Sequence, residues 1–231
     1  MGAPQPAGTV PVAQRDWGAW FKEHTREVGF GVGAVVVLFA AGWLYVTSEA
    51  RKQAFAAQAL TQARSDAEAG NLPLAASDLS RIIDRYGGSA AADEAAVLLY
   101  EIRLIQGQSA EAVKDLQGFV QKGHPKYMLA SAWSLLGGGL EDQHKYKDAA
   151  AAYRRASEEA THDFLKAQYL LDAGRTLALA NDSAASRAAY AEVIQKYGEL
   201  GQAAEARVRL GELGGSVPAP PSEKPAAKNA G

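Results

Sequence analysis

The sequence ASAWSLLGGGLEDQHKYKDAAAAYRRA, residues 130–156, contains two Ala- and Leu-rich segments joined by a short polar turn. Its landmarks recur along the chain every 37 residues. One column of the repeat holds small residues: Ala75, Ala112, Ala149 and Ser186. Two columns hold mainly large apolar or aromatic residues: Leu79, Leu116, Tyr153 and Tyr190 in one, and Ile82, Phe119, Ala156 and Val193 in the other. A fourth column holds turn-forming residues: Gly70, Gly107, His144 and Asn181. A period of this length predicts stacked helix pairs.

The third repeat also carries a known signature. Its landmark residues resemble the tetratricopeptide repeat pattern W-x2-L-G-x2-Y followed by A-x3-F-x2-A: Trp133, Leu136, Gly137, Leu140, Ala149, Tyr153 and Ala156. The second repeat departs from the pattern, with Tyr100 where glycine is expected. The resemblance implies an all-α solenoid of four units at about 56–92, 93–129, 130–166 and 167–203, followed by a capping helix at 204–213.

Close packing within each unit requires a small residue on one helix opposite a large one on the other. The small-residue positions on the first helices are Ala63, Gly137 and Gly174, with Gly211 one period beyond. A single unit cannot bury its apolar stripe, so neighbouring units must stack. Trp133 is expected to be a buried core residue of the third unit.

Between Glu27 and Glu49 the chain reads VGFGVGAVVVLFAAGWLYVTS, without a charged residue. As a helix this segment would be about 30 Å long, the thickness of a bilayer hydrocarbon core. Trp17, Trp20 and Phe21 precede it, and Trp43 and Tyr45 lie near its end, as expected at the two interfaces. A cleaved signal peptide would start nearer the N-terminus, and a buried globular helix would show a polar face. A single transmembrane helix at 28–48 is therefore predicted, surrounded by membrane lipid.

The remaining segments complete the domain plan. Residues 1–27 are expected to form a short, partly disordered tail and residues 49–213 the repeat domain. Residues 214–231 are rich in Pro, Gly and Ala and are expected to be disordered. The helix that opens the first unit is expected to continue directly from the membrane helix to Ala69.

The composition excludes several functional classes. The net charge of −2 argues against nucleic-acid binding, and the absence of cysteine excludes disulfides and cysteine-ligated zinc. The four histidines are scattered, and neither a phosphate-binding loop nor a hydrolase motif occurs. We therefore expect no enzymatic activity, cofactor, metal site or small-molecule substrate.

Repeat arrays of this type present a surface to protein partners. In tetratricopeptide proteins the first helix of each unit usually lines that surface, which implies a groove formed by Glu94, Val97, Glu101, Leu104 and Ile105; Ser131, Ser134, Glu141 and Asp142; and Gln168, Leu171, Arg175 and Leu179. These side chains suit a segment with basic character. Some of them are expected to pack between helices instead, most readily Leu104 and Leu179.

The overall plan resembles the YfgM-type ancillary subunits of the SecYEG translocon. The likeness is strongest in WFKEHTREVGFGVGAVVVLFAAGWLYVTSEARKQAFAAQAL, residues 20–60. It implies a bacterial inner-membrane protein with a cytoplasmic N-terminus and a periplasmic repeat domain. Such a protein would act as a scaffold or chaperone-like adaptor for translocon subunits, exported clients or periplasmic chaperones.

Sidedness and two other functions remain open. Arg15, Lys22 and Arg26 precede the apolar segment, while Arg51, Lys52 and Arg64 follow it, so charge does not decide orientation. The stretch GGSAAADEAAVLLYEI, residues 87–102, is also similar to repeats of cell-division coordinators, which implies an envelope-assembly adaptor. A regulator that sequesters a signalling component is the third hypothesis.

Overall fold

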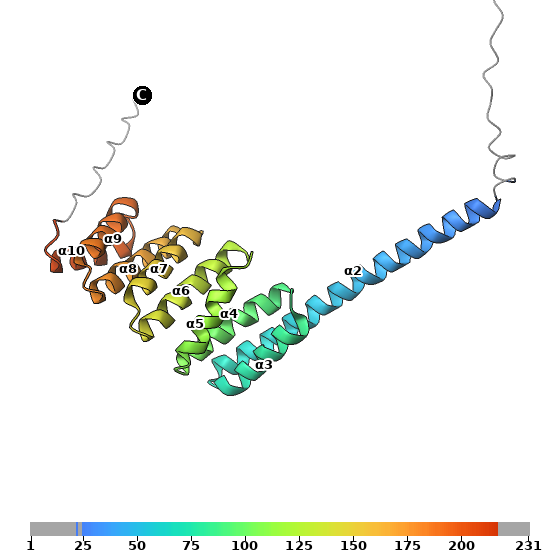
Figure 1. Cartoon of the computed structure of the whole chain (residues 1–231), viewed down its shortest axis with the longest axis horizontal. Helices are drawn as coiled ribbons and strands as arrows, with labels where there is room; N and C mark the ends of the chain where they lie inside the picture. The colour runs from blue at the N-terminus through green and yellow to red at the C-terminus, as the bar shows by residue number, and fades with distance from the viewer. Residues whose placement is uncertain (1–21, 23–24, 217–231) are drawn as a thin grey trace, which may run out of the picture. The chain divides into compact units, whose positions relative to one another are not determined.

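The structure is a computed structural model that describes residue 22 and residues 25–216, without the side chains of residues 27 and 28. Every regular element in this part of the chain is an α-helix, which confirms the all-α prediction (Figure 1). The nine described helices are α2 (Thr25–Glu68), α3 (Leu72–Tyr86), α4 (Ala90–Ile105), α5 (Ser109–Val120), α6 (Lys126–Asp142), α7 (Tyr146–Glu159), α8 (Asp163–Leu179), α9 (Ser183–Lys196) and α10 (Gly201–Glu212).

Helix α2 contains the apolar segment and continues without interruption to Glu68, as expected. Among the described residues it is the one helix that is long and apolar enough to cross a membrane, and none of its most apolar 18-residue window is buried. The chain divides within α2 into two compact units, residues 1–52 and 53–231. The second unit contains all the helix pairs.

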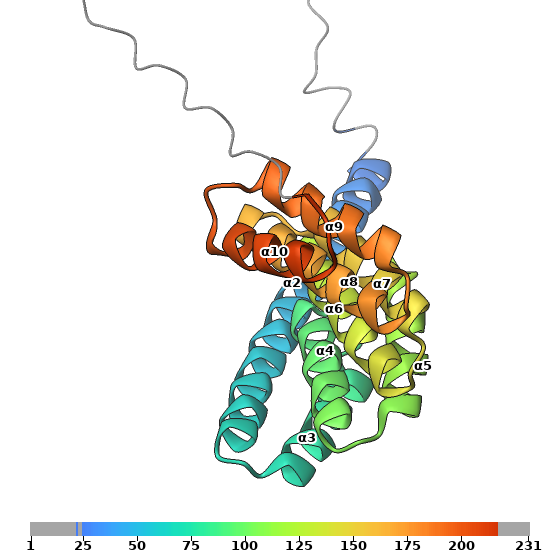
Figure 2. The same ribbon diagram turned by 90° about the vertical axis from the view of Figure 1, so that its left-hand side faces the viewer.

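The second unit consists of helix pairs in chain order, as Figures 1 and 2 show. The C-terminal part of α2 packs with α3, and the later pairs are α4 with α5, α6 with α7 and α8 with α9, followed by α10. All twelve residues in the three packing columns of the repeat are at most 7% exposed. The 37-residue period therefore predicted the core of every pair.

The turn column is confirmed by backbone conformation. Gly70, Gly107, His144 and Asn181 all have positive φ, between 58° and 81°. At Gly107 the backbone N–H donates to the Leu104 carbonyl at 2.9 Å, and the next N–H donates to the Arg103 carbonyl at 2.8 Å. The other three turns repeat this pair of bonds. Each first helix thus ends in a Schellman motif, which favours glycine or asparagine because the left-handed conformation disfavours most side chains.

Small and large residues meet within the pairs as predicted. A Cβ atom on Gly137 would lie 2.8 Å from the Tyr153 ring, and one on Gly174 would lie 2.6 Å from the Tyr190 ring. In the second pair Tyr100 replaces the small residue and packs edge-on against Phe119, with ring centroids 6.1 Å apart. The aromatic rings therefore fill the spaces that the glycines leave.

Trp133 differs from its prediction as a buried core residue. Its side chain is only half-buried and packs at the margin of the central core cluster. The surface hollow that its ring lines is also lined by Gln117 on α5, Gln121 just after α5, and Ala151 and Ala152 on α7. The alanines are too short to cover an indole ring, and the glutamines are exposed.

Candidate functional site

The candidate site is the surface formed by the first helices of the pairs, α4, α6 and α8, together with α10; we call it the A-helix face. Helix α4 contacts α6, and α8 contacts α10, whereas α5, α7 and α9 each pack mainly against the neighbouring first helices. The array is therefore tighter on the side of the first helices. Residues one period apart fall at equivalent places along this face.

The predicted groove residues differ in how accessible they are. Seven are exposed: Glu101, Ile105, Ser131, Asp142, Gln168, Arg175 and Leu179. Five are half-buried: Glu94, Val97, Leu104, Ser134 and Glu141. Leu171 is only 4% exposed and lies in the C-terminal core cluster, so it supports the helix packing and not the accessible surface.

One position of the face joins neighbouring pairs, and its chemistry changes along the array. A Cβ atom on Gly139 of α6 would lie 2.9 Å from Leu104 Cδ2 of α4, so this contact is apolar. One period later, the Thr176 hydroxyl of α8 lies 2.8 Å from Glu141 Oε1 of α6. Leu104 thus packs between helices as expected, and Glu141 takes the equivalent place with a polar bond.

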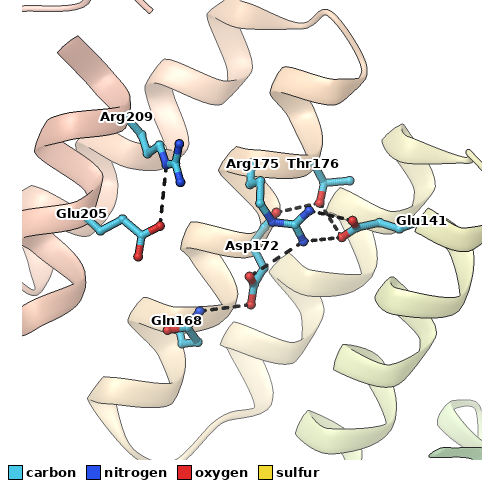
Figure 3. Close-up of polar contacts among 7 residues, drawn as sticks. All are labelled: Glu141, Gln168, Asp172, Arg175, Thr176, Glu205 and Arg209. Carbon is cyan, nitrogen blue, oxygen red and sulfur yellow. Dashed lines mark hydrogen bonds and ion pairs between the residues drawn. The ribbon is translucent and has the colours of Figure 1, made fainter. Parts of the chain in front are cut away.

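Glu141 is the centre of a polar network between α6 and α8 (Figure 3). The two terminal nitrogens of Arg175 donate to its two carboxylate oxygens, each at 2.7 Å. Planar guanidinium and carboxylate groups form strong bidentate pairs of this kind. The Glu141 side chain is 15% exposed, and that of Arg175 is 45% exposed. The network therefore fixes one edge of the A-helix face.

The two carboxylates beside Arg175 have opposite pKa shifts. Burial alone would raise the pKa of Glu141, but its hydrogen bonds from Arg175 and Thr176 hold that pKa below the usual value. Burial raises the pKa of Asp172, and the nearby negative charges of Glu141 and Glu205 add to this effect. Arg175 lies 4.0 Å from Asp172, beyond hydrogen-bond distance, because its guanidinium is bonded to Glu141.

Glu141→Gln should lower the free energy of unfolding at pH 7 by about 1–2 kcal/mol, because it removes a charge-assisted bidentate pair. A lowered folded-state pKa gives stability that is present above the unfolded pKa of about 4.3 and is lost as the pH falls through the folded value. The wild type should therefore lose more stability below pH ~4.3 than the variant does. Urea unfolding at a series of pH values measures this difference.

A matched control for this prediction is Glu158→Gln. Glu158 pairs with Arg155 at 2.8 Å on the surface of α7, where both side chains are more than 60% exposed. Its loss should cost about 0–0.5 kcal/mol, as for other exposed pairs on helices. Equal losses in the two variants would contradict the role given to Glu141.

Other acidic residues of the face are also held by contacts within the chain. Glu94 on α4 forms an ion pair with Arg64 on α2 at 2.6 Å. Asp142 accepts a hydrogen bond from the Ser109 hydroxyl at 2.7 Å. These carboxylates are therefore less free to bind basic groups of a partner than the composition of the face suggests.

The C-terminal end of the face contains a small cavity of about 280 Å³ between α8, α9 and α10. Leu179, Ala178, Tyr190 and Leu213 line it with apolar surface, and Arg175, Arg209 and Glu212 border it. Leu179 is 48% exposed, and Val208 on α10 is 61% exposed. Apolar side chains are thus accessible here beside charged groups.

Several residues of this face or of the polar contacts beneath and beside it were missed in the sequence, namely Arg64, Asp172, Thr176, Glu205, Val208 and Arg209. The repeat contained a signal for some of them. Arg64 shares a column with Glu101 and Arg175, while Glu205 and Val208 share columns with Gln168 and Leu171. Extending the columns into α2 and α10 would have found these three.

The fold and the packing of the A-helix face define a helical-repeat scaffold. The chain belongs to the tetratricopeptide repeat-like domain family, whose pattern matches residues 18–215. Domains of this type bind proteins and are typically non-catalytic, which implies protein partners. A comparison with curated proteins finds no match. Within the described part of the chain, no group of three or more His, Asp or Glu side chains could hold a metal ion.

Proposed function

We propose that this chain is a membrane-tethered scaffold without catalytic activity, which binds segments of other proteins on its A-helix face beside the SecYEG translocon. The observation that carries the scaffold role is the accessibility of Ile105, Leu179 and Val208 on that face, each 48–64% exposed. Exposed apolar surface rimmed by polar residues marks protein-binding sites, and Leu179 continues into the apolar lining of the cavity between α8, α9 and α10. Glu101 and Asp172 would attract basic residues of the bound segment.

The tether is supported by the extent of the family match. It begins at residue 18 and therefore includes the apolar segment together with the repeats. A signal peptide is removed from the mature protein, so it would not be expected within a domain pattern. We propose that residues 28–48 span the inner membrane.

The translocon assignment and the sidedness rest on the resemblance to YfgM-type proteins. In that arrangement residues 1–27 are cytoplasmic, and the repeat domain at 49–213 is periplasmic. The groove then comprises the twelve accessible predicted residues and those of α10. Its partners would be channel subunits, exported clients or periplasmic chaperones.

Site-specific photocrosslinking tests this function. A photoreactive residue at Glu101 or Gln168, both exposed on first helices, should yield crosslinks to channel subunits or exported proteins in native membranes. Lys114 on α5 and Ala188 on α9 are exposed on second helices and serve as control positions. Mass spectrometry identifies the products.

The possible outcomes separate the parts of the proposal. Equal crosslinking from the control positions would contradict the A-helix face as the binding surface. Recovery of only cell-division or cell-wall proteins from Glu101 and Gln168 would leave the scaffold role intact but overturn the translocon assignment. Recovery of only cytoplasmic signalling proteins would overturn the periplasmic placement.

A further inference from the structure

A second surface feature lies on the opposite side of α6 from the A-helix face. It is a cleft of about 570 Å³ between α5, α6 and α7, which we call the outer cleft. Its apolar lining consists of Val120, Trp133, Leu136, Leu140, Ala151 and Ala152. Trp133 is two residues from the groove residue Ser131, and residues two apart on a helix point in nearly opposite directions. The cleft is therefore separate from the proposed binding face.

The repeat shows that this cleft is specific to the third pair. The equivalent groove between α7 and α9 is crossed by an ion pair between Arg154 and Glu192 at 3.2 Å. One period before the outer cleft, Arg103 on α4 forms an ion pair with Asp115 on α5, at the positions that Leu140 and Ala152 occupy in the cleft. At the positions of Arg154 and Glu192, the outer cleft has Gln117 and Arg155, and Arg155 bonds to Glu158 on its own helix. No ion pair between the described residues closes this groove.

The lining of the cleft indicates what it would bind. An aromatic ring beside amide side chains suits proline-containing segments, because proline rings pack on aromatic faces and extended backbones leave their carbonyls free for donors. Gln117 and Gln121 supply such donors on the α5 rim. Asp148 on the α7 rim has no ion pair among the described residues and can receive a cation.

The chain itself contains a segment of this chemistry. Residues 217–231 read VPAPPSEKPAAKNAG and follow directly after the described residues. The Leu213 carbonyl accepts a hydrogen bond from Arg187 on α9 at 3.3 Å, so the segment starts beside α9. Helix α9 is joined to α7 by Arg154 and Glu192, and the outer cleft lies on the other flank of α7.

The length of the segment fits this route. A helix with its side chains is about 10–12 Å wide, so passing over α9 and α7 requires about 20–24 Å. In an extended polyproline conformation, eight or nine residues reach about 25–28 Å. Pro218, Pro220 and Pro221 would act as a stiff spacer, and Lys224 and Pro225 would arrive at the cleft.

We propose that the chain's own C-terminal segment occupies the outer cleft, with Pro225 against the Trp133 ring and Lys224 paired with Asp148. Bound in this way, the segment covers the outer cleft and shields Trp133 from water. The A-helix face remains free for partners.

Tryptophan fluorescence of the full chain tests the proposal. Replacing Trp17, Trp20 and Trp43 by Phe leaves Trp133 as the sole tryptophan. In detergent micelles, deletion of residues 217–231 should shift its emission to longer wavelength and increase quenching by acrylamide. Adding a synthetic peptide of residues 217–231 should reverse both changes, and a peptide with Pro225→Ala and Lys224→Glu should not. Unchanged emission and quenching after the deletion would overturn the proposal.

Disulfide trapping gives an independent readout, because the chain has no cysteine of its own. Gln117→Cys combined with Ala226→Cys should form an intrachain disulfide, whereas Glu101→Cys with Ala226→Cys should not. Disulfide formation requires Cβ atoms about 4 Å apart, so it reports proximity directly. An interchain disulfide, or equal trapping at Glu101, would contradict occupation of the cleft by the same chain's segment.

Discussion

Gly174→Ala is expected to lower the free energy of unfolding by about 2 kcal/mol, although alanine is the better helix former by about 1 kcal/mol. The added Cβ would lie 2.6 Å from Tyr190 Cε1, a distance that forces the ring or the helix to move. Tyr190 is 2% exposed, and the Ser186 hydroxyl donates to the Gly174 carbonyl at 2.7 Å, so neither helix has room to shift. Thermal and urea unfolding measure the loss.

The first helix pair suggests a rescue for this variant. There Ala63 and Leu79 occupy the positions of Gly174 and Tyr190, and both are fully buried. The double variant Gly174→Ala with Tyr190→Leu should therefore be more stable than the sum of the single changes implies, with a coupling energy of about 1–3 kcal/mol. Additive effects in the double-mutant cycle would show that the two side chains do not compete for space.

Gly118→Ala is the matched control for the glycine effect. Gly118 lies in α5 with open space around the position of a Cβ atom. The substitution should stabilise the protein by about 0.5–1 kcal/mol, because only the helix propensity changes. Destabilisation at Gly118 similar to that at Gly174 would contradict the packing explanation.

The second large effect concerns the proposed tether. Val36→Arg combined with Phe39→Arg should move the chain from the membrane pellet to the soluble fraction after alkaline carbonate extraction. Each arginine at the centre of a spanning helix costs about 2.5–3.5 kcal/mol on insertion scales. Both residues lie in the apolar stretch of α2 and are 60–80% exposed in the absence of lipid.

Phe55→Arg is the control on the same helix. Phe55 is 60% exposed but lies after Arg51 and Lys52, outside the apolar stretch, so this variant should stay in the pellet. A pelleted Val36→Arg/Phe39→Arg chain would contradict the tether. A wild-type chain shortened by about 48 residues and found in the soluble fraction would indicate a cleaved leader instead.

The sequence was sufficient to predict the helix pairs, their turns and their cores, because these features are local and periodic. Gly107 lies at a left-handed turn whose conformation recurs in every pair, and Gly137, like Gly174, leaves room for a tyrosine ring on the facing helix. The pairs of charged residues across repeats were harder to predict. Arg64 and Arg175 share a column, yet Arg64 pairs with a carboxylate on the following helix of the face and Arg175 with one on the preceding helix.

The signature residue Trp133 shows a different limit. Its place in the motif predicted burial, but burial depends on what the neighbouring helices supply. Ala151 and Ala152 on α7 leave the indole partly uncovered. No pattern within the third repeat alone contains that information, because half of the environment belongs to α5 of the second.

The contact between Gly139 and Leu104 bears on how such a protein can be rearranged. The four identical turns give the units one length, so a 37-residue block could be duplicated without a change of phase. If the third unit were duplicated directly after itself, however, Gly139 of the second copy would face Glu141 of the first copy in place of Leu104. At that junction the Glu141 carboxylate would face a glycine and would lose the hydrogen bond that the Thr176 hydroxyl gives it in the natural array. The units are thus interchangeable in length but ordered by their junctions, and engineered arrays should preserve that order.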